Sequence, residues 1–168
     1  MRVLRPVILF LLLTTSLDSE QLCTSFECQL KAALLVKLVT LIQNTNEIHF
    51  CVSASSPIRD FIQTGFAENK AYLSNVSLQL VERLDQKCDV YFLDAGFNNL
   101  GIEELRVTQA LLIANGDHVL GRALSEKCGI IIQKEENKFR LVINKKNLLK
   151  SRVELDSSIF RLAKVIID

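Results

Sequence analysis

The sequence predicts a single-domain α/β protein with a mainly parallel sheet, helices on both faces, and a C-terminal hairpin followed by a helix. Short apolar, β-branched segments alternate with helical patterns along the chain, and strands separated by helices pair in parallel. Only two prolines and six glycines occur in 168 residues, so no flexible linker divides the chain. Residues 20–168 are therefore expected to form one domain with its own core.

Residues 1–19 are predicted to be an export signal. Arg2 and Arg5 give a positively charged start, and Val7–Leu13 is an apolar segment too short to be an ordinary membrane span. Small residues favour cleavage after Ser19, with Ser16 as the alternative. An uncleaved anchor stays open, because the site lacks an Ala-x-Ala pattern. We therefore expect the protein in the periplasm, where disulfides can form.

The first helix is predicted over Ser25–Gln43, and its apolar residues cover more than one stripe. Beyond Gln29 its only charges are Lys31 and Lys37. A helix of this kind must be covered on two sides. It is either a buried core helix or one that also forms a partner or dimer interface. The candidate interface residues are Leu34, Leu38, Leu41 and Ile42.

The next elements alternate between strand and helix. The pattern predicts a central strand at Glu47–Ala54, a helix from Ser56 to Gly65, a strand at Ser77–Glu82 and a buried strand at Cys88–Asp94. Ser56 is the expected N-cap of that helix, and Pro57 its first residue.

The second half of the chain closes the sheet with a hairpin. The pattern predicts a helix over Leu100–Thr108, a strand at Ala110–Ala114, a turn at Asn115-Gly116-Asp117, a short helix near His118–Ser125, hairpin strands at Gly129–Gln133 and Lys138–Ile143, and a helical turn at Asn144–Lys150. Asp156 is expected to cap a final amphipathic helix. The inward face of that helix is predicted to hold Ile159, Phe160, Leu162, Ala163 and Ile166.

Charge and motif content argue against several function classes. Without the signal, acidic and basic residues are equal in number. The absence of net charge argues against electrostatic binding to nucleic acid or to an anionic membrane surface. His49 and His118 lie far apart and form no metal-ligand spacing. Glycine-rich nucleotide motifs and a Gly-x-Ser-x-Gly elbow are missing. We therefore predict no catalytic residues, no metal and no cofactor.

A ligand site, if present, is expected at the carboxyl ends of the strands. Open α/β sheets usually bind ligands there, and Ser53, Asp94 and Asn115 follow three predicted strands. Ser53, Ser55 and Ser56 could also surround an anion at a helix N-terminus. Structural capping by these polar residues remains the alternative.

The five cysteines are an odd number, so at least one is unpaired or intermolecular. In a sheet of order 2-1-3, Cys51 and Cys88 would lie on neighbouring strands, within disulfide reach if they share a face. Two buried thiols remain the alternative. Cys23 and Cys28 could bridge only if that segment is unwound. Cys128 is the candidate odd thiol, and its basic neighbour makes it the single basis for a thiol-enzyme hypothesis.

Several segments, in order, resemble the YfiR-like family of periplasmic regulators. Phe139-Arg-Leu-Val-Ile143-Asn144, followed by Val153-Glu-Leu155-Asp156-Ser-Ser-Ile159-Phe160-Arg-Leu162-Ala163, is similar to its closing F-x-x-x-I-N … L-x-L-S-S-x-L-L-x-L-A pattern. Leu30-Lys31-Ala32-Ala33-Leu34 resembles its opening helix. Phe50-Cys51-Val52 and Cys88-Asp89-Val90-Tyr91-Phe92 resemble its two cysteine-bearing strands. The likeness covers about residues 30–168. The family's aromatic-rich end of the first helix, usually closing in Trp-Pro, is replaced by Leu41-Ile42-Gln43-Asn44.

The resemblance implies a non-enzymatic periplasmic protein, often dimeric. Such a protein binds the periplasmic portion of an inner-membrane diguanylate cyclase and represses it, which lowers cyclic di-GMP signalling and biofilm formation. The resemblance also favours a Cys51–Cys88 disulfide. The alternative is a periplasmic small-ligand-binding accessory protein of another membrane sensor, with its pocket near Ser53, Asp94 and Asn115.

Overall fold

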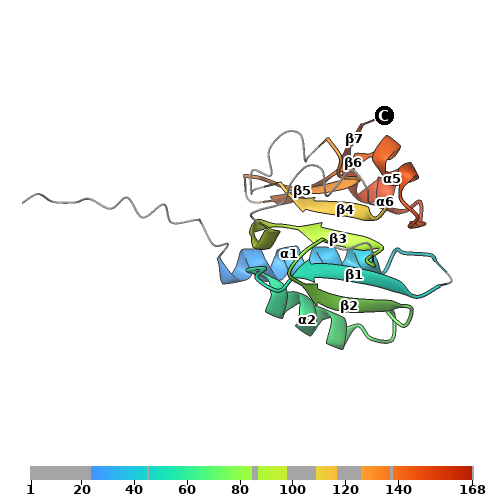
Figure 1. Cartoon of the computed structure of the whole chain (residues 1–168). Coiled ribbons are helices and arrows are strands. Elements are labelled where there is room, and N and C mark those ends of the chain that lie inside the picture. Colours follow the sequence, from blue (N-terminus) through green and yellow to red (C-terminus); the bar gives the residue numbers. More distant parts are fainter. Residues whose placement is uncertain are drawn as a thin grey trace, which may run out of the picture.

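A computed structural model describes residues 24–44, 46–84, 87–97, 109–116, 126–136 and 138–167, with the side chains of 164–166 left out. It contains one seven-stranded sheet of order β2-β1-β3-β4-β5-β6-β7 (Figure 1). The elements are α1 (Ser25–Val39), β1 (Ile48–Ser53), α2 (Arg59–Glu68), β2 (Val76–Val81), β3 (Val90–Leu93), η1 (Ala95–Phe97), β4 (Leu111–Asn115), β5 (Ile130–Glu135), β6 (Lys138–Asn144), α5 (Lys145–Lys150), α6 (Ile159–Leu162) and β7 (Ala163–Ile167).

The sheet is mainly parallel, as the sequence predicts. Every neighbouring pair is parallel except the antiparallel β5–β6 hairpin. β1 lies between β2 and β3, which is the order 2-1-3 that a Cys51–Cys88 disulfide would require. The register pairs Phe50 with Leu78 on one side and with Val90 on the other. β2 is added on one side of β1 and β3 on the other, so the strand order reverses between β1 and β3, where open α/β sheets have their switch point.

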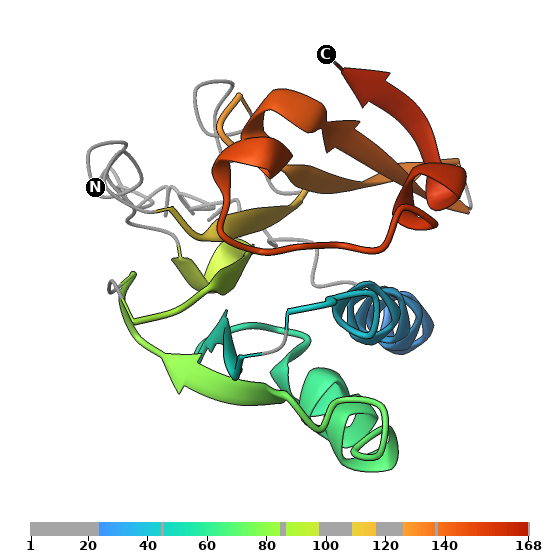
Figure 2. The same ribbon diagram turned by 90° about the vertical axis from the view of Figure 1, so that its right-hand side faces the viewer.

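Alternate residues of β1, β3 and β4 face two separate apolar clusters. Phe50, Phe92 and Ile113 belong to the larger cluster, which also contains core residues of α1, α2, α5 and α6. Cys51 and Tyr91 belong to a smaller cluster on the opposite face. Figure 2 shows α1 and α2 side by side on one side of the sheet. The helices predicted at 100–108 and 118–125 lie outside the described residues.

The N-terminus of α1 packs against the hairpin. Thr24 and Glu27 form a capping box, which satisfies two backbone N–H groups of the first turn. Glu27 also forms an ion pair with Lys134 of β5. Lys31 is buried, and its ammonium lies 5.2 Å from the ring centroid of Phe139 on β6, a cation–π distance.

The prediction for the C-terminal helix is wrong beyond its first turn. α6 ends at Leu162, and β7 then pairs in parallel with β6. Val165, Ile166 and Ile167 are β-branched, which favours a strand. Without β7, β6 would be an edge strand with unpaired backbone groups. The predicted hairpin and the helical turn that follows it are confirmed as β5, β6 and α5.

The predicted signal, residues 1–19, lies outside the described part of the chain. Within the part described, no helix is long and apolar enough to cross a membrane.

Candidate functional site

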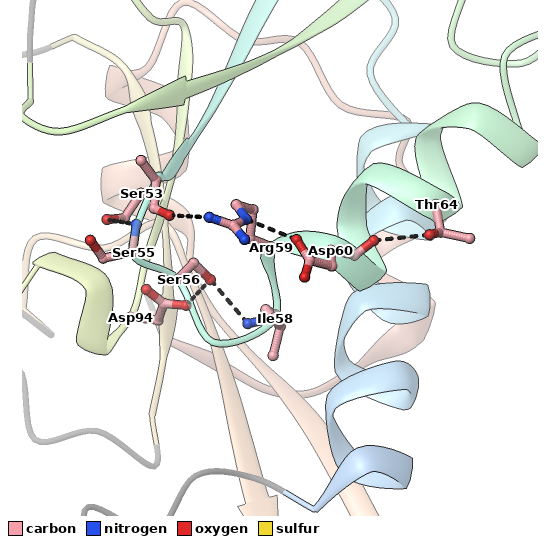
Figure 3. Close-up of polar contacts among 9 residues, drawn as sticks. Ser53, Ser55, Ser56, Ile58, Arg59, Asp60, Thr64 and Asp94 are labelled. Atoms are coloured by element: carbon pink, nitrogen blue, oxygen red, sulfur yellow. Dashed lines mark hydrogen bonds and ion pairs between the residues drawn. The ribbon is translucent and has the colours of Figure 1, made fainter.

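Polar side chains meet at the carboxyl ends of β1 and β3, where the sequence places a ligand site (Figure 3). The hydroxyl of Ser56 donates to Oδ2 of Asp94 at 2.5 Å. The N–H of Gly96 donates to Oδ1 of the same carboxylate at 2.9 Å. Ser56 Oγ accepts the N–H of Ile58 at 3.3 Å. Ser53 and Asp94 are each 1% exposed. These contacts tie the β1–α2 loop to the turn that follows β3.

Ser56 is therefore not the helix cap that the sequence predicts. α2 begins at Arg59 after Ile58, which makes no side-chain cap bond. Ser56 contacts Asp94 instead, because the loop after β1 passes directly over the end of β3. A buried carboxylate costs much free energy unless it is hydrogen-bonded, and the Ser56 hydroxyl supplies one of its bonds.

Gly96 is required by the close approach of these two loops. A Cβ on Gly96 would lie 2.6 Å from both Cβ and Oγ of Ser53 and 2.8 Å from the backbone nitrogen of Ser56. The Ser53 hydroxyl also donates to the Gly96 carbonyl at 2.8 Å and accepts the N–H of Ser55 at 3.2 Å. The hydroxyls of Ser53 and Ser56, two of the three serines that could surround an external anion, are thus engaged within the protein.

Asn115 leaves one acceptor in this region unsatisfied. It ends β4, is 3% exposed, and its Oδ1 has no hydrogen-bond partner within the part of the chain that the structure describes. Leu93 of β3 pairs with Ala114 of β4. Asp94 and Asn115 are the next residues of these two neighbouring strands, so they lie at the same level of the sheet. Burying such an acceptor costs about 1–3 kcal/mol, and an unsatisfied buried group requires an explanation.

The predicted interface residues of α1 divide into two groups. Leu38 and Ile42 are 1% and 9% exposed and belong to the protein's own core, so the prediction is wrong for these two. Leu34 and Leu41 are half-buried, and an interface role for them stays a prediction. The large apolar side chains that α1 does expose are Phe26 and Leu30, which the sequence pattern did not single out.

A family model described as YfiR/HmsC-like matches residues 28–164. The chain belongs to the YfiR/HmsC-like family. This family is periplasmic and regulatory rather than catalytic, and it suggests a regulator of diguanylate cyclase signalling. The match covers the described sheet from before β1 to the start of β7.

No curated protein matches this YfiR/HmsC-like chain. Eight chains of solved structures match it. One is the ABC domain in complex with L-Trp from Streptococcus pneumonia, with a TM-score of 0.49 and 14% sequence identity. The match covers 81% of this chain and 62% of that one. A likeness of this level carries no argument about function.

The cysteine-bearing segments of this YfiR/HmsC-like chain are joined by a disulfide between Cys51 and Cys88, with the Cα atoms 6.0 Å apart. Cys88 lies in the turn before β3 rather than on the strand, so it reaches Cys51 from the end of the neighbouring strand. Cys28 is also disulfide-bonded. Cys23 lies outside the described residues.

Cys128 is not part of a disulfide, and it is fully buried. Burial raises the pKa of its thiol to about 12. A reactive thiol needs exposure and a lowered pKa, so the one candidate for a thiol enzyme is lost. The described residues also contain no group of three His, Cys, Asp or Glu that could hold a metal.

Residues of the segments that resemble the family make contacts within the fold. Lys31 of the opening segment lies over Phe139 of the closing one. The closing Asn144 caps α5 by accepting the N–H of Asn147 at 3.0 Å. Both contacts hold elements of the sheet and its helical layer together. Lys31, Phe139 and Asn144 thus have structural roles in this chain.

Proposed function

We propose that this protein is a periplasmic, non-catalytic regulator that binds the periplasmic portion of an inner-membrane diguanylate cyclase. Binding represses the cyclase, which lowers cyclic di-GMP and biofilm formation. The observation that carries this proposal is the family match over residues 28–164. Two structural facts support it. The polar cluster around Asp94 makes its hydrogen bonds internally, and the buried Cys128 is unsuited to nucleophilic chemistry.

The test is capture of the partner from membranes. The tagged full chain is expressed in the periplasm of its own host, purified from solubilised membranes, and its co-purifying proteins are identified by mass spectrometry. Recovery of a membrane protein with a diguanylate cyclase domain is expected. Deletion of the gene should raise cellular cyclic di-GMP, and re-expression should lower it again. Capture of no cyclase, or an unchanged cyclic di-GMP level, contradicts the proposal.

The unsatisfied acceptor of Asn115 favours a second candidate function, the binding of a small ligand at the strand ends. An unsatisfied amide oxygen at the end of β4, the strand next to the one that Asp94 follows, suits a donor with positive charge, such as a primary ammonium group. The probe is n-butylammonium, and butyltrimethylammonium is the control because it has the same charge and no N–H donor. The expected result is a rise in thermal stability with the first compound only.

Asn115→Leu distinguishes a binding role from a purely structural one. This substitution removes a buried, unsatisfied group, so we expect the free protein to be as stable as before or more stable. It should also abolish the response to n-butylammonium. If the unchanged chain does not respond to n-butylammonium, this second candidate is rejected.

A further inference from the structure

A groove lies on the outer surface of the protein between α1 and α2. Its cavity volume is about 550 Å³, within the range of binding pockets. Val36, Lys37 and Leu41 line it from the α1 side, and Gly65 and Glu68 line it from α2. Tyr72, just beyond α2, completes the lining.

Gly65 brings the two helices together at one point of the groove. A Cβ on Gly65 would lie 2.8 Å from Cγ2 of Val36, closer than real Cβ contacts. The missing side chain lets α2 approach α1 closely. The larger residues Lys37, Glu68 and Tyr72 stand around this contact and give the groove its depth.

The groove continues along α1 as an exposed apolar stripe. Phe26, Leu30, Ala33 and Lys37 follow one another at intervals of four, three and four residues, which places them on one face of the helix. Phe26 is 71% exposed and Leu30 is 43% exposed. From Phe26 to Lys37 the stripe is about 16 Å long at 1.5 Å per residue. This length matches about three turns of a second helix.

Three of the exposed large apolar side chains of the described residues belong to this surface. They are Phe26, Leu30 and Tyr72, the last being 77% exposed. Apolar side chains gathered in one exposed region mark an interaction site more often than scattered ones do. Figure 1 shows α1 and α2 adjacent on the same side of the sheet, so one segment can contact both.

The charges in the groove indicate what kind of segment fits. Lys37 on α1 and Glu68 on α2 are both exposed and line the same groove. A segment lying between them is best matched by an acidic side chain toward Lys37 and a basic one toward Glu68. Its remaining contacts must be apolar to cover Phe26, Leu30 and Tyr72.

We propose that this groove binds an amphipathic helix of the regulated cyclase's periplasmic portion. That helix carries apolar residues three and four positions apart, one acidic residue and one basic residue, as in other helix-in-groove interfaces. The inference rests on the proposed function. A second copy of this chain is a poorer occupant. A two-fold interface would place the groove of one copy against the groove of the other, and neither copy would fill the other's groove.

The experiment compares variants of the full tagged chain in the membrane capture described above. Lys37→Glu, Glu68→Lys and Phe26→Ser alter the groove surface. The matched controls are Lys150→Glu, which reverses a lysine in the last turn of α5 as Lys37→Glu does in α1, and Leu149→Ser, which removes an apolar side chain that is 83% exposed. Circular dichroism melting shows that each variant is folded, and light scattering gives its molar mass.

The expected result is that each groove variant captures at least about tenfold less cyclase, while both controls capture as much as the unchanged chain. Equal capture by groove variants and unchanged chain overturns the docking surface and leaves the proposed function standing. Equal loss in the controls also overturns it. If the unchanged chain captures no cyclase, both proposals fall. A groove variant that loses only self-association identifies a second copy as the occupant and overturns the inference.

Discussion

Removal of the Cys51–Cys88 disulfide is predicted to destabilise the protein strongly. The bond closes a loop with a sequence separation of 37 residues. A cross-link that closes a loop of this length lowers the conformational entropy of the unfolded chain. On the chain-entropy estimate, this raises the free energy of unfolding by about 3–4 kcal/mol. This is a large part of the roughly 5–15 kcal/mol by which a typical domain is stable.

The double variant Cys51→Ala/Cys88→Ala tests this magnitude by urea unfolding. The free energy of unfolding should fall by about 3–4 kcal/mol, and the melting temperature by roughly 10 °C. Substitution is preferable to a reductant, because Cys28 is also disulfide-bonded and would be reduced as well.

Cys128→Ala is the control for this measurement. It removes a sulfur from the same apolar cluster and breaks no cross-link, so a loss of about 1 kcal/mol is expected. If the double variant loses no more stability than Cys128→Ala, the reasoning from loop closure is refuted. An unchanged dependence of the free energy on urea concentration is expected only for Cys128→Ala, because loss of a cross-link expands the unfolded state.

Three further predictions concern other contacts. Gly96→Ala places a Cβ against Ser53 and should cost about 1–3 kcal/mol in urea unfolding; unchanged stability would show that the loops can separate. Because burial raises the pKa of Cys128 to about 12, Ellman's reagent at pH 8 should label it only after unfolding, and rapid labelling of the native protein would contradict this. The Lys134 ammonium lowers the pKa of Glu27 below 4.5, so the stabilisation from this pair is present above that pH and is lost as the pH falls through the lowered pKa. Glu27→Gln should therefore reduce the loss of stability in acid, and an identical pH profile would argue against the pair.

Much of the fold could be predicted because successive side chains of a strand point to opposite faces of the sheet, which gives the sequence a period of two residues. Phe50 and Phe92 alternate with Cys51 and Tyr91, and in the structure these pairs face opposite clusters. The order of β2, β1 and β3 was considered only as the arrangement that would bring Cys51 and Cys88 together, and the structure has that order. The polar residues Ser53, Asp94 and Asn115 were also found from the sequence, because parallel strands end at one edge.

The orientation of α1 could not be predicted. Its residues are apolar on nearly all sides, so no stripe distinguishes Leu38, which is buried, from Leu30, which is exposed. Only packing against the sheet decides which face points inward. The groove with α2 depends in turn on Gly65 and Val36, which lie far apart in the chain and meet only in the folded protein.

The sequence by itself determined the class of fold and the hairpin, because these follow from local periodicity and short connections. The tertiary structure decided three other features. β7 forms because β6 offers an open edge. Ser56 bonds to Asp94 because two loops converge, and Cys88 reaches Cys51 from a turn. Each of these depends on the distance between segments remote in sequence, which no local pattern records.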